Sequence, residues 1–392
     1  MYKHLAFLLV ASGLLFARAE KAIAYPEFIG YGYSSCVTCH YNTQGMGPLN
    51  DYGRALFAAE ISSRALFDES TTDEQLGESA GFLGKKQLPF WFRPSIKYRG
   101  LWFNTDPGSI ENRKRFVVMQ QDLNLALHDR EQRFTFVGNL GWAQRAGAGP
   151  YRSEVWLSRE HYLRWQMSKE WWLSVGMLDK VFGIRQIDHT AYSREKLGLN
   201  NYRTTEYTLT HGAVLQWNQA EREITLHAFL GNYNELEDLR QKGASLMAEW
   251  QTAENSRTGG SLLYSTSENV VQTRYALHQR LGLSHGSSLL AEAGYHRDEN
   301  KNAQTWATGY YAYTQSNILL TRGYNFVSLA EYYMGKTNQG AAPDQFRWGL
   351  GFLTFPLPRV EIRLMAIDIR QWSPDKGVKD TWQAQGQLHL SL

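Results

Sequence analysis

The stretches QFRWGLGFLTF, residues 345–355, and RVEIRLMAI, residues 359–367, decide the fold class. In the second stretch, apolar residues alternate with Glu361 and Arg363. Successive side chains point to opposite faces of a β-strand, so this period of two predicts strands with one apolar face and one polar face. The short join FPLPR between the two stretches predicts a turn.

Alternating stretches of this kind recur from Pro89 to the end of the chain, as in SIKYRGLW, DLNLALH, RFTFVGNLGW, REITLHAFL and SLLAEAGY. We count about sixteen, each long enough to cross a bilayer when tilted. Short joins follow even-numbered strands, and longer polar joins follow odd-numbered ones, the longest running from Asp179 to Arg203. One join, from Ser265 to Asn269, is short where this alternation predicts a long loop. Short turns on one side and long loops on the other are typical of outer-membrane barrels.

The sequence therefore predicts an all-β protein, an outer-membrane β-barrel of about 16 antiparallel strands over residues 89–392. The alternative is a soluble sandwich or several small domains, in which Trp171, Trp172 and Trp348 would be core residues. Composition favours the barrel, because 22 Tyr and 13 Trp suit two interfacial girdles, while a mean hydropathy of -0.45 is too polar for a bundle of membrane helices. The net charge of +3 gives no electrostatic case for a nucleic-acid partner.

The N-terminus has the pattern of a secretory signal peptide. An apolar run from Leu5 to Phe16 is followed by the small-residue site Ala22-Ile23-Ala24. The run is short for a membrane span, so we expect residues 1–24 to be a cleaved export signal.

Both cysteines of the chain lie in the sequence Cys36-Val37-Thr38-Cys39-His40, which is a C-x-x-C-H motif. The spacing lets two thiols reach the two vinyl groups of one haem, while the adjacent histidine turns under the iron. The motif predicts one covalent haem c with His40 as the proximal iron ligand. A structural disulfide, a thioredoxin-like redox pair and half of a zinc site are the alternatives, but none of them requires the histidine.

Residues 25–66 are predicted to form a small α/coil cytochrome c segment around this motif. Gly45 and Gly47 make the stretch NTQGMGP turn-rich, so the backbone can pass close to the haem ring. Asn50 or Asp51 is expected to cap a short helix. The apolar face of that helix, which carries Tyr52, Leu56 and Ala59, would cover the haem or pack on the barrel wall.

Three other residues are candidates for contact with the expected haem. Met46 lies six residues beyond His40, about 20 Å of extended chain, and is a candidate for the sixth iron ligand. His128, reaching inward from the barrel wall, is another. Arg54 would pair with a haem propionate or lie exposed to solvent. Residues 67–88 are acidic and turn-rich and are expected to be a linker.

The stretch TCHYNTQGMGPLNDYGRAL, followed by the barrel pattern, resembles the fused outer-membrane cytochrome-porins of iron-oxidising bacteria. This resemblance rests on Cys36, Cys39, His40 and the architecture. It implies one c-type haem ahead of or within a barrel of about sixteen strands, and electron transfer from an extracellular donor such as ferrous iron to a periplasmic c-type cytochrome. It also implies contact with outer-membrane lipid and a haem segment that enters from the periplasmic side.

Three functions follow from these features. The first is electron transfer by the single haem, an oxidoreductase role that needs no catalytic acid or base, with the haem segment plugging the lumen and bringing the haem near the outer loops. The second is a porin whose haem segment is a plug or a docking module for a periplasmic cytochrome. The third is a haem peroxidase or sensor, which would need an open sixth position at the iron and polar distal groups.

Overall fold

A computed structural model describes residues 26–45, 47–84, 88–106, 113–144, 154–184, 191, 196–199, 209–284, 286–338, 340–341, 344–373 and 377–392. The expected signal peptide, residues 1–24, lies outside the described residues, and so does Met46.

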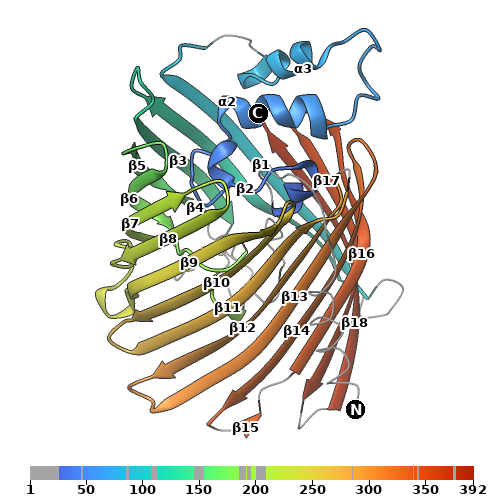
Figure 1. Cartoon of the computed structure of the whole chain (residues 1–392). Coiled ribbons are helices and arrows are strands. Elements are labelled where there is room, and N and C mark those ends of the chain that lie inside the picture. The colour runs from blue at the N-terminus through green and yellow to red at the C-terminus, as the bar shows by residue number, and fades with distance from the viewer. Residues whose placement is uncertain are drawn as a thin grey trace.

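The strands form one antiparallel sheet that closes on itself, because β1 pairs with both β2 and β18 (Figure 1). The strands are β1 (Phe92–Thr105), β2 (Arg113–His128), β3 (Phe134–Gln144), β4 (Glu154–Leu157), β5 (His161–Gln166), β6 (Trp171–Asp179), β7 (Leu209–Asn218), β8 (Arg222–Phe229), β9 (Lys242–Ala253), β10 (Ser256–Thr266), β11 (Val270–Gly282), β12 (Ser288–Asn300), β13 (Thr305–Thr321), β14 (Tyr324–Thr337), β15 (Gly340–Ala341), β16 (Asp344–Leu357), β17 (Val360–Ser373) and β18 (Gly377–Ser391). β4 and β5 both pair with β3, and β15 and β16 both pair with β14, so the 18 segments make a 16-stranded barrel. The predicted fold class is confirmed, and the sandwich and the several small domains are wrong.

The two ends of the barrel differ in the length of their connections. The turn end, as we call it, carries the joins that follow even-numbered barrel strands, such as residues 254–255, 322–323 and 358–359. The loop end carries the others, and the longest runs from residue 180 to residue 208. The join between β10 and β11 lies at the loop end although it spans only residues 267–269. The predicted strand count was therefore right at this join.

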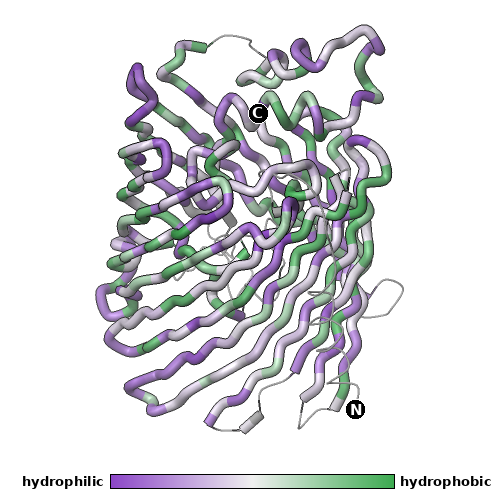
Figure 2. Tube along the Cα trace, viewed as in Figure 1, coloured by the Kyte–Doolittle hydropathy of each residue, from purple (hydrophilic) through white to green (hydrophobic). Residues whose placement is uncertain are grey.

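The outer face of the barrel is apolar and the inner face is polar. On β11, Tyr275 and Leu277 point outward and are exposed, whereas Arg274, His278 and Arg280 are buried within the barrel. Figure 2 shows the same alternation of hydrophobic and hydrophilic residues along the other strands. This inside-out arrangement is expected of a wall that faces lipid.

Aromatic side chains gather toward both ends of the outer face, as the composition predicted. Toward the turn end, the rings of Phe134 and Trp165 stack with their centroids 5.9 Å apart. Toward the loop end, Trp348 and Trp382 meet edge to face at 5.7 Å. Such rings suit the boundary between lipid and water.

The chain before the barrel folds into and across the turn end (Figure 1). Its elements are the 3₁₀-helices η1 (Pro26–Tyr31) and η2 (Cys36–Thr38), the helix α2 (Asp51–Leu56), the π-helix η3 (Phe57–Ile61), the helix α3 (Asp73–Ser79) and the 3₁₀-helix η4 (Phe82–Gly84). Apolar packing holds this segment in the lumen: Phe28 and Ile61 form a core with side chains of β14, β16 and β17, and Tyr41 joins another that includes Val137 and Val214. None of the described helices is long and apolar enough to cross a membrane.

Residues 67–88, which we expected to be a turn-rich linker, contain the short helix α3 at their centre. Thr72 and Gln75 make a reciprocal capping box that starts α3. Leu76 then packs against Ala58 of η3 in a small apolar cluster. A capping box satisfies two backbone donors at a helix start, so this helix is specified locally.

Candidate haem-attachment site

The C-x-x-C-H motif is wound into one helical turn. Within it, the backbone amides of Cys39 and His40 both donate to the carbonyl oxygen of Cys36, at 3.2 and 3.1 Å. The two cysteines are not joined in a disulfide. This turn therefore brings two thiols and one imidazole together on one short piece of backbone.

The loop after His40 turns back along the motif. His40 and Leu49 form an antiparallel bridge, and the amide of Asn50 donates to the carbonyl oxygen of Cys39 at 2.8 Å. Gly45, at the tip, has a φ of +76°, and a β-carbon there would lie 3.3 Å from the Cys36 sulfur. The glycine-rich turn was predicted to allow close approach, and the structure places it directly beside this sulfur. Met46 follows, so its candidacy as an iron ligand stays a prediction.

Asn50 is the predicted helix cap, and it also binds the motif. Its side-chain oxygen accepts from the amide of Gly53 at 2.8 Å, which caps α2. Its side-chain nitrogen donates to the carbonyl oxygen of Thr38 at 2.8 Å. One side chain therefore fixes both the start of α2 and the position of this helix against the motif.

The face of α2 that carries Leu56 covers Cys39. Leu56, Cys39 and Tyr33 are all buried in one cluster. Tyr52 was expected on the same covering face, but half of its surface is exposed and its hydroxyl lies 3.1 Å from that of Tyr33. Leu56 thus covers Cys39, with Tyr52 at the rim of this cluster, and cover of a haem by this face stays a prediction.

Burial raises the pKa of the Cys39 thiol to about 12. The Cys39 thiol is therefore protonated and shielded from solvent, whereas Cys36 is only partly buried. Among the described residues, no cluster of three or more His, Cys, Asp or Glu side chains is arranged to hold a metal ion.

A cavity opens beside His40 between the N-terminal segment and the barrel wall. We call it the His40 cavity. The segment contributes His40, Leu49, Arg54 and Phe57 to its lining. The wall residues that line it include Ser95, Lys97, Asn124, Arg159, Glu361 and His389.

Several polar atoms around the His40 cavity are buried with no hydrogen-bond partner among the described residues. They are Arg54 Nη2, Ser95 Oγ, Asn124 Nδ2 and His389 Nε2. Buried polar groups are nearly always satisfied, so such a set indicates a place for a bound molecule or for water. His40, Leu49, Phe57 and Arg54 line this cavity, and the thiols of Cys36 and Cys39 belong to the same helical turn as His40. These residues fit a haem, whose propionates would take the guanidinium of Arg54.

Direct hydrogen bonds tie the loop after the motif to the barrel wall. Asn42 donates to Glu160 at 3.2 Å, and Gln44 donates to Thr225 at 3.0 Å. The Arg164 guanidinium donates to the carbonyl oxygen of Tyr41 at 3.0 Å and lies over its ring at 5.8 Å. No local pattern indicated these wall partners, because they lie more than a hundred residues away along the chain.

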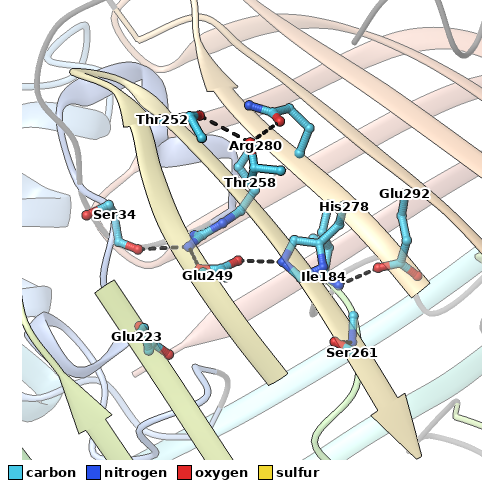
Figure 3. A network of polar contacts seen from close by, with 12 residues as sticks. Ser34, Ile184, Glu223, Glu249, Thr252, Thr258, Ser261, His278, Arg280 and Glu292 are labelled. Atoms are coloured by element: carbon cyan, nitrogen blue, oxygen red, sulfur yellow. Dashed lines mark hydrogen bonds and ion pairs between the residues drawn. The ribbon is translucent and has the colours of Figure 1, made fainter. Parts of the chain in front are cut away.

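Two sets of polar contacts tie inserted segments to the inner wall of the barrel (Figure 3). Arg280 donates to the Ser34 carbonyl oxygen at 3.0 Å and forms an ion pair with Glu249, which also binds His278 at 2.8 Å. Farther along, the amide of Ile184 donates to Glu292. Residue 184 belongs to the long loop-end connection, so segments from both ends fold into the lumen.

His128 does not meet His40 in the cavity. Its ring lies against Tyr41, with the centroids 4.8 Å apart, and its Nδ1 is 3.1 Å from the Thr135 hydroxyl. His128 is absent from the lining of the His40 cavity. The histidine that the fold does bring to this cavity is His389, near the C-terminus of the chain.

No protein-family model and no curated protein sequence matches this chain. Solved structures of outer-membrane proteins do match its fold. OmpT of Vibrio cholerae has a TM-score of 0.57 and 10% sequence identity, and the match covers 77% of this chain and 97% of OmpT. The channel DcaP of Acinetobacter baumannii has a TM-score of 0.55 and 11% identity, with 77% and 97% covered.

The match to an anion-selective porin from Comamonas acidovorans has a TM-score of 0.51 and 6% identity, and covers 77% of this chain and 99% of that porin. Identities this low speak for the fold alone. The chain is a closed 16-stranded antiparallel barrel with the fold of outer-membrane porins.

Proposed function

We propose that this barrel spans a bacterial outer membrane with its turn end in the periplasm. Its exposed apolar face, with aromatic residues toward both ends, supports a lipid environment. Barrels of this kind keep their short turns on the periplasmic side. The N-terminal segment then enters the lumen from the periplasm.

We infer that the segment carries one covalent haem c. Each thiol of Cys36 and Cys39 would add across one vinyl group, the sulfur bonding to the carbon next to the ring and the hydrogen going to the outer carbon. His40 would bind the iron, and the group would supply one-electron transfer when bound. Because Cys39 is buried beneath α2, attachment would precede docking of the segment in the lumen.

The function best supported is a porin-like barrel whose haem segment closes the lumen and exchanges electrons with a periplasmic c-type cytochrome at the turn end. The observation that carries it is the position of the motif, which packs into the lumen beside turn-end wall residues such as Ser95 and His389. This position supports the hypothesis of a porin whose haem segment is a plug, because the segment lies inside the lumen. The earlier expectation that the plug brings the haem near the outer loops loses support.

The cytochrome-porins that the sequence resembles take electrons from an extracellular donor such as ferrous iron. Such uptake would extend electron transfer from the haem to the outside of the cell. The donor would have to enter the loop-end half of the lumen, past the segment around Phe182 and Ile184. We therefore place the periplasmic exchange first and treat iron as a donor to be tested.

The experiment uses the full chain made in cells that mature haem c. We expect a haem-staining band in the outer-membrane fraction whose migration changes on boiling, and no haem in the Cys36→Ser/Cys39→Ser variant. The oxidised protein is then mixed in a stopped-flow cell with a reduced c-type cytochrome or with ferrous iron. Rapid reduction by the cytochrome supports the periplasmic port, and reduction by iron would extend the path outward. A barrel that folds without covalent haem would contradict the haem proposal.

A further inference from the structure

His389 occupies a defined place on the inner wall of the barrel. It lies on β18, opposite Arg99 of β1 and Glu361 of β17. Its side chain is 9% exposed and lines the His40 cavity together with His40. The closure of the barrel is what brings these two histidines to one cavity, because β18 completes the wall beside β1.

The neighbours of His389 orient its ring. Its Nδ1 lies 3.1 Å from Oε2 of Glu361. A carboxylate only accepts hydrogen bonds, so Nδ1 donates to it, and the lone pair of the neutral ring is then on Nε2. A carboxylate behind a histidine is the arrangement that fixes the ring of a metal ligand and raises its basicity.

Arg99 could instead donate a hydrogen bond to this nitrogen, because its Nη2 also lies 3.1 Å from Nδ1 of His389. Nδ1 cannot donate to Glu361 and accept from Arg99 at once. A guanidinium has five N–H donors and is not obliged to use this one on Nδ1, whereas the carboxylate of Glu361 gains a charge-assisted bond only if Nδ1 carries the proton. We therefore assign the proton to Nδ1.

The other side of the ring faces the cavity. Nε2 is buried and has no hydrogen-bond partner among the described residues. A buried, correctly oriented nitrogen lone pair without a donor is costly unless something binds it. The His40 cavity also contains the histidine of the C-x-x-C-H motif. Haem iron is therefore the group that we expect to bind the lone pair of Nε2.

We propose that His389 is the second axial ligand of the haem iron and that Glu361 positions its ring. This inference rests on the proposed function, because it requires a haem on Cys36 and Cys39. It makes the iron six-coordinate, which suits electron transfer and leaves no open position for peroxide. It also predicts a lower reduction potential than a His/Met pair would give.

The test uses the full-length haem protein from outer membranes, first measured by the pyridine haemochrome assay. Visible and electron paramagnetic resonance spectra then give the spin state. We expect wild type to be low-spin with two imidazole ligands, and His389→Ala to become high-spin, to bind carbon monoxide and to return to low-spin when imidazole is added. The matched control His128→Ala should keep the wild-type spectrum.

Two further variants keep the test decisive if His389→Ala fails to fold. His389→Met should stay low-spin, acquire the spectrum of methionine ligation and show a raised midpoint potential. Glu361→Gln should leave the spin state unchanged but raise the midpoint potential, because the ring loses its anionic partner; a merely structural role for Glu361 would leave the potential unmoved.

The outcomes separate this inference from the function on which it rests. A low-spin His389→Ala or His389→Met protein with the wild-type spectrum and potential would overturn the assignment of His389 while leaving the haem in place. A folded wild-type barrel that contains no covalent haem would overturn the proposed function. Loss of the low-spin spectrum in His128→Ala alone would assign the ligand to His128 instead.

Discussion

Gly53 lies where α2 packs against the C-x-x-C-H motif. A β-carbon at this position would lie 2.5 Å from the carbonyl oxygen of Cys39 and 2.7 Å from its β-carbon. Since a carbonyl oxygen in the backbone cannot swing away, the helix itself would have to move. Only a glycine lets α2 approach the motif this closely.

Gly53→Ala should therefore destabilise the docked segment by about 1–3 kcal/mol, the usual cost of overpacking. Gly77→Ala in α3 is the matched control, because a β-carbon there meets nothing closer than the Ala55 β-carbon at 3.4 Å. That change should be neutral or stabilising by up to about 1 kcal/mol through helix propensity. Hydrogen exchange of residues 26–84 measures both. Equal protection in the two variants would contradict the proposed packing.

The helical elements are held to the barrel by arginines in the turns. Arg322, between β13 and β14, donates to the carbonyl oxygens of Ser62 at 2.9 Å and Ala58 at 3.2 Å, and also to that of Ala59. Arg359, between β16 and β17, donates to the carbonyl oxygens of Ser79 and Gly81. The carbonyl groups at the end of a helix lack intrahelical partners, so a guanidinium stabilises them well.

Arg322→Gln should loosen η3 and α3 from the turn end, since hydrogen bonds from a charged group contribute about 1.5–3 kcal/mol. We expect faster cleavage within residues 47–84 during limited proteolysis, while the barrel still migrates as a folded species before boiling. Arg370→Gln is the control, because Arg370 pairs with Asp380 on the exposed surface. Equal cleavage rates in the two variants would show that Arg322 does not hold the segment against the barrel.

At the scale of the whole molecule, local sequence patterns were sufficient to predict the strands of the barrel wall. They were not sufficient to predict which segments fill the lumen. QFRWGLGFLTF and RVEIRLMAI became β16 and β17, because alternation along a strand is a property of neighbouring residues. The capping box at Thr72 was equally local, but the acidic composition around it favoured a linker.

The contents of the lumen depend on pairings between distant strands. His389 alternates with Leu388 and Leu390 and lies on the inner face of its strand, but only the β1–β18 closure brings it to the cavity of His40. The inward course of Phe182 and Ile184 had no local signal either, since an apolar residue in a long polar connection also occurs in exposed loops. The haem-attachment motif could be recognised from the sequence, because its two cysteines and its histidine lie within five consecutive residues.

The filled lumen leads to a prediction about conductance. Contacts from Phe28 to Ile61 fill the turn-end half, and the segment around Phe182 occupies part of the loop-end half. Deleting residues 26–84 should leave a folded barrel, because ion pairs such as Arg347 with Glu331 and Arg159 with Asp122 join wall residues to each other. Single channels of this variant in planar bilayers should then conduct measurably more than those of the full chain.

The control for this comparison is the full-length Cys36→Ser/Cys39→Ser variant, which lacks the thiols for haem but keeps the segment. If the segment itself closes the lumen, this variant should conduct as little as the wild type. Conductance that rises in the serine variant as much as in the deletion would assign closure to the haem. Equal conductance in all three proteins would mean that the loop-end segment alone limits the pore, and the plug would then be a docking module only.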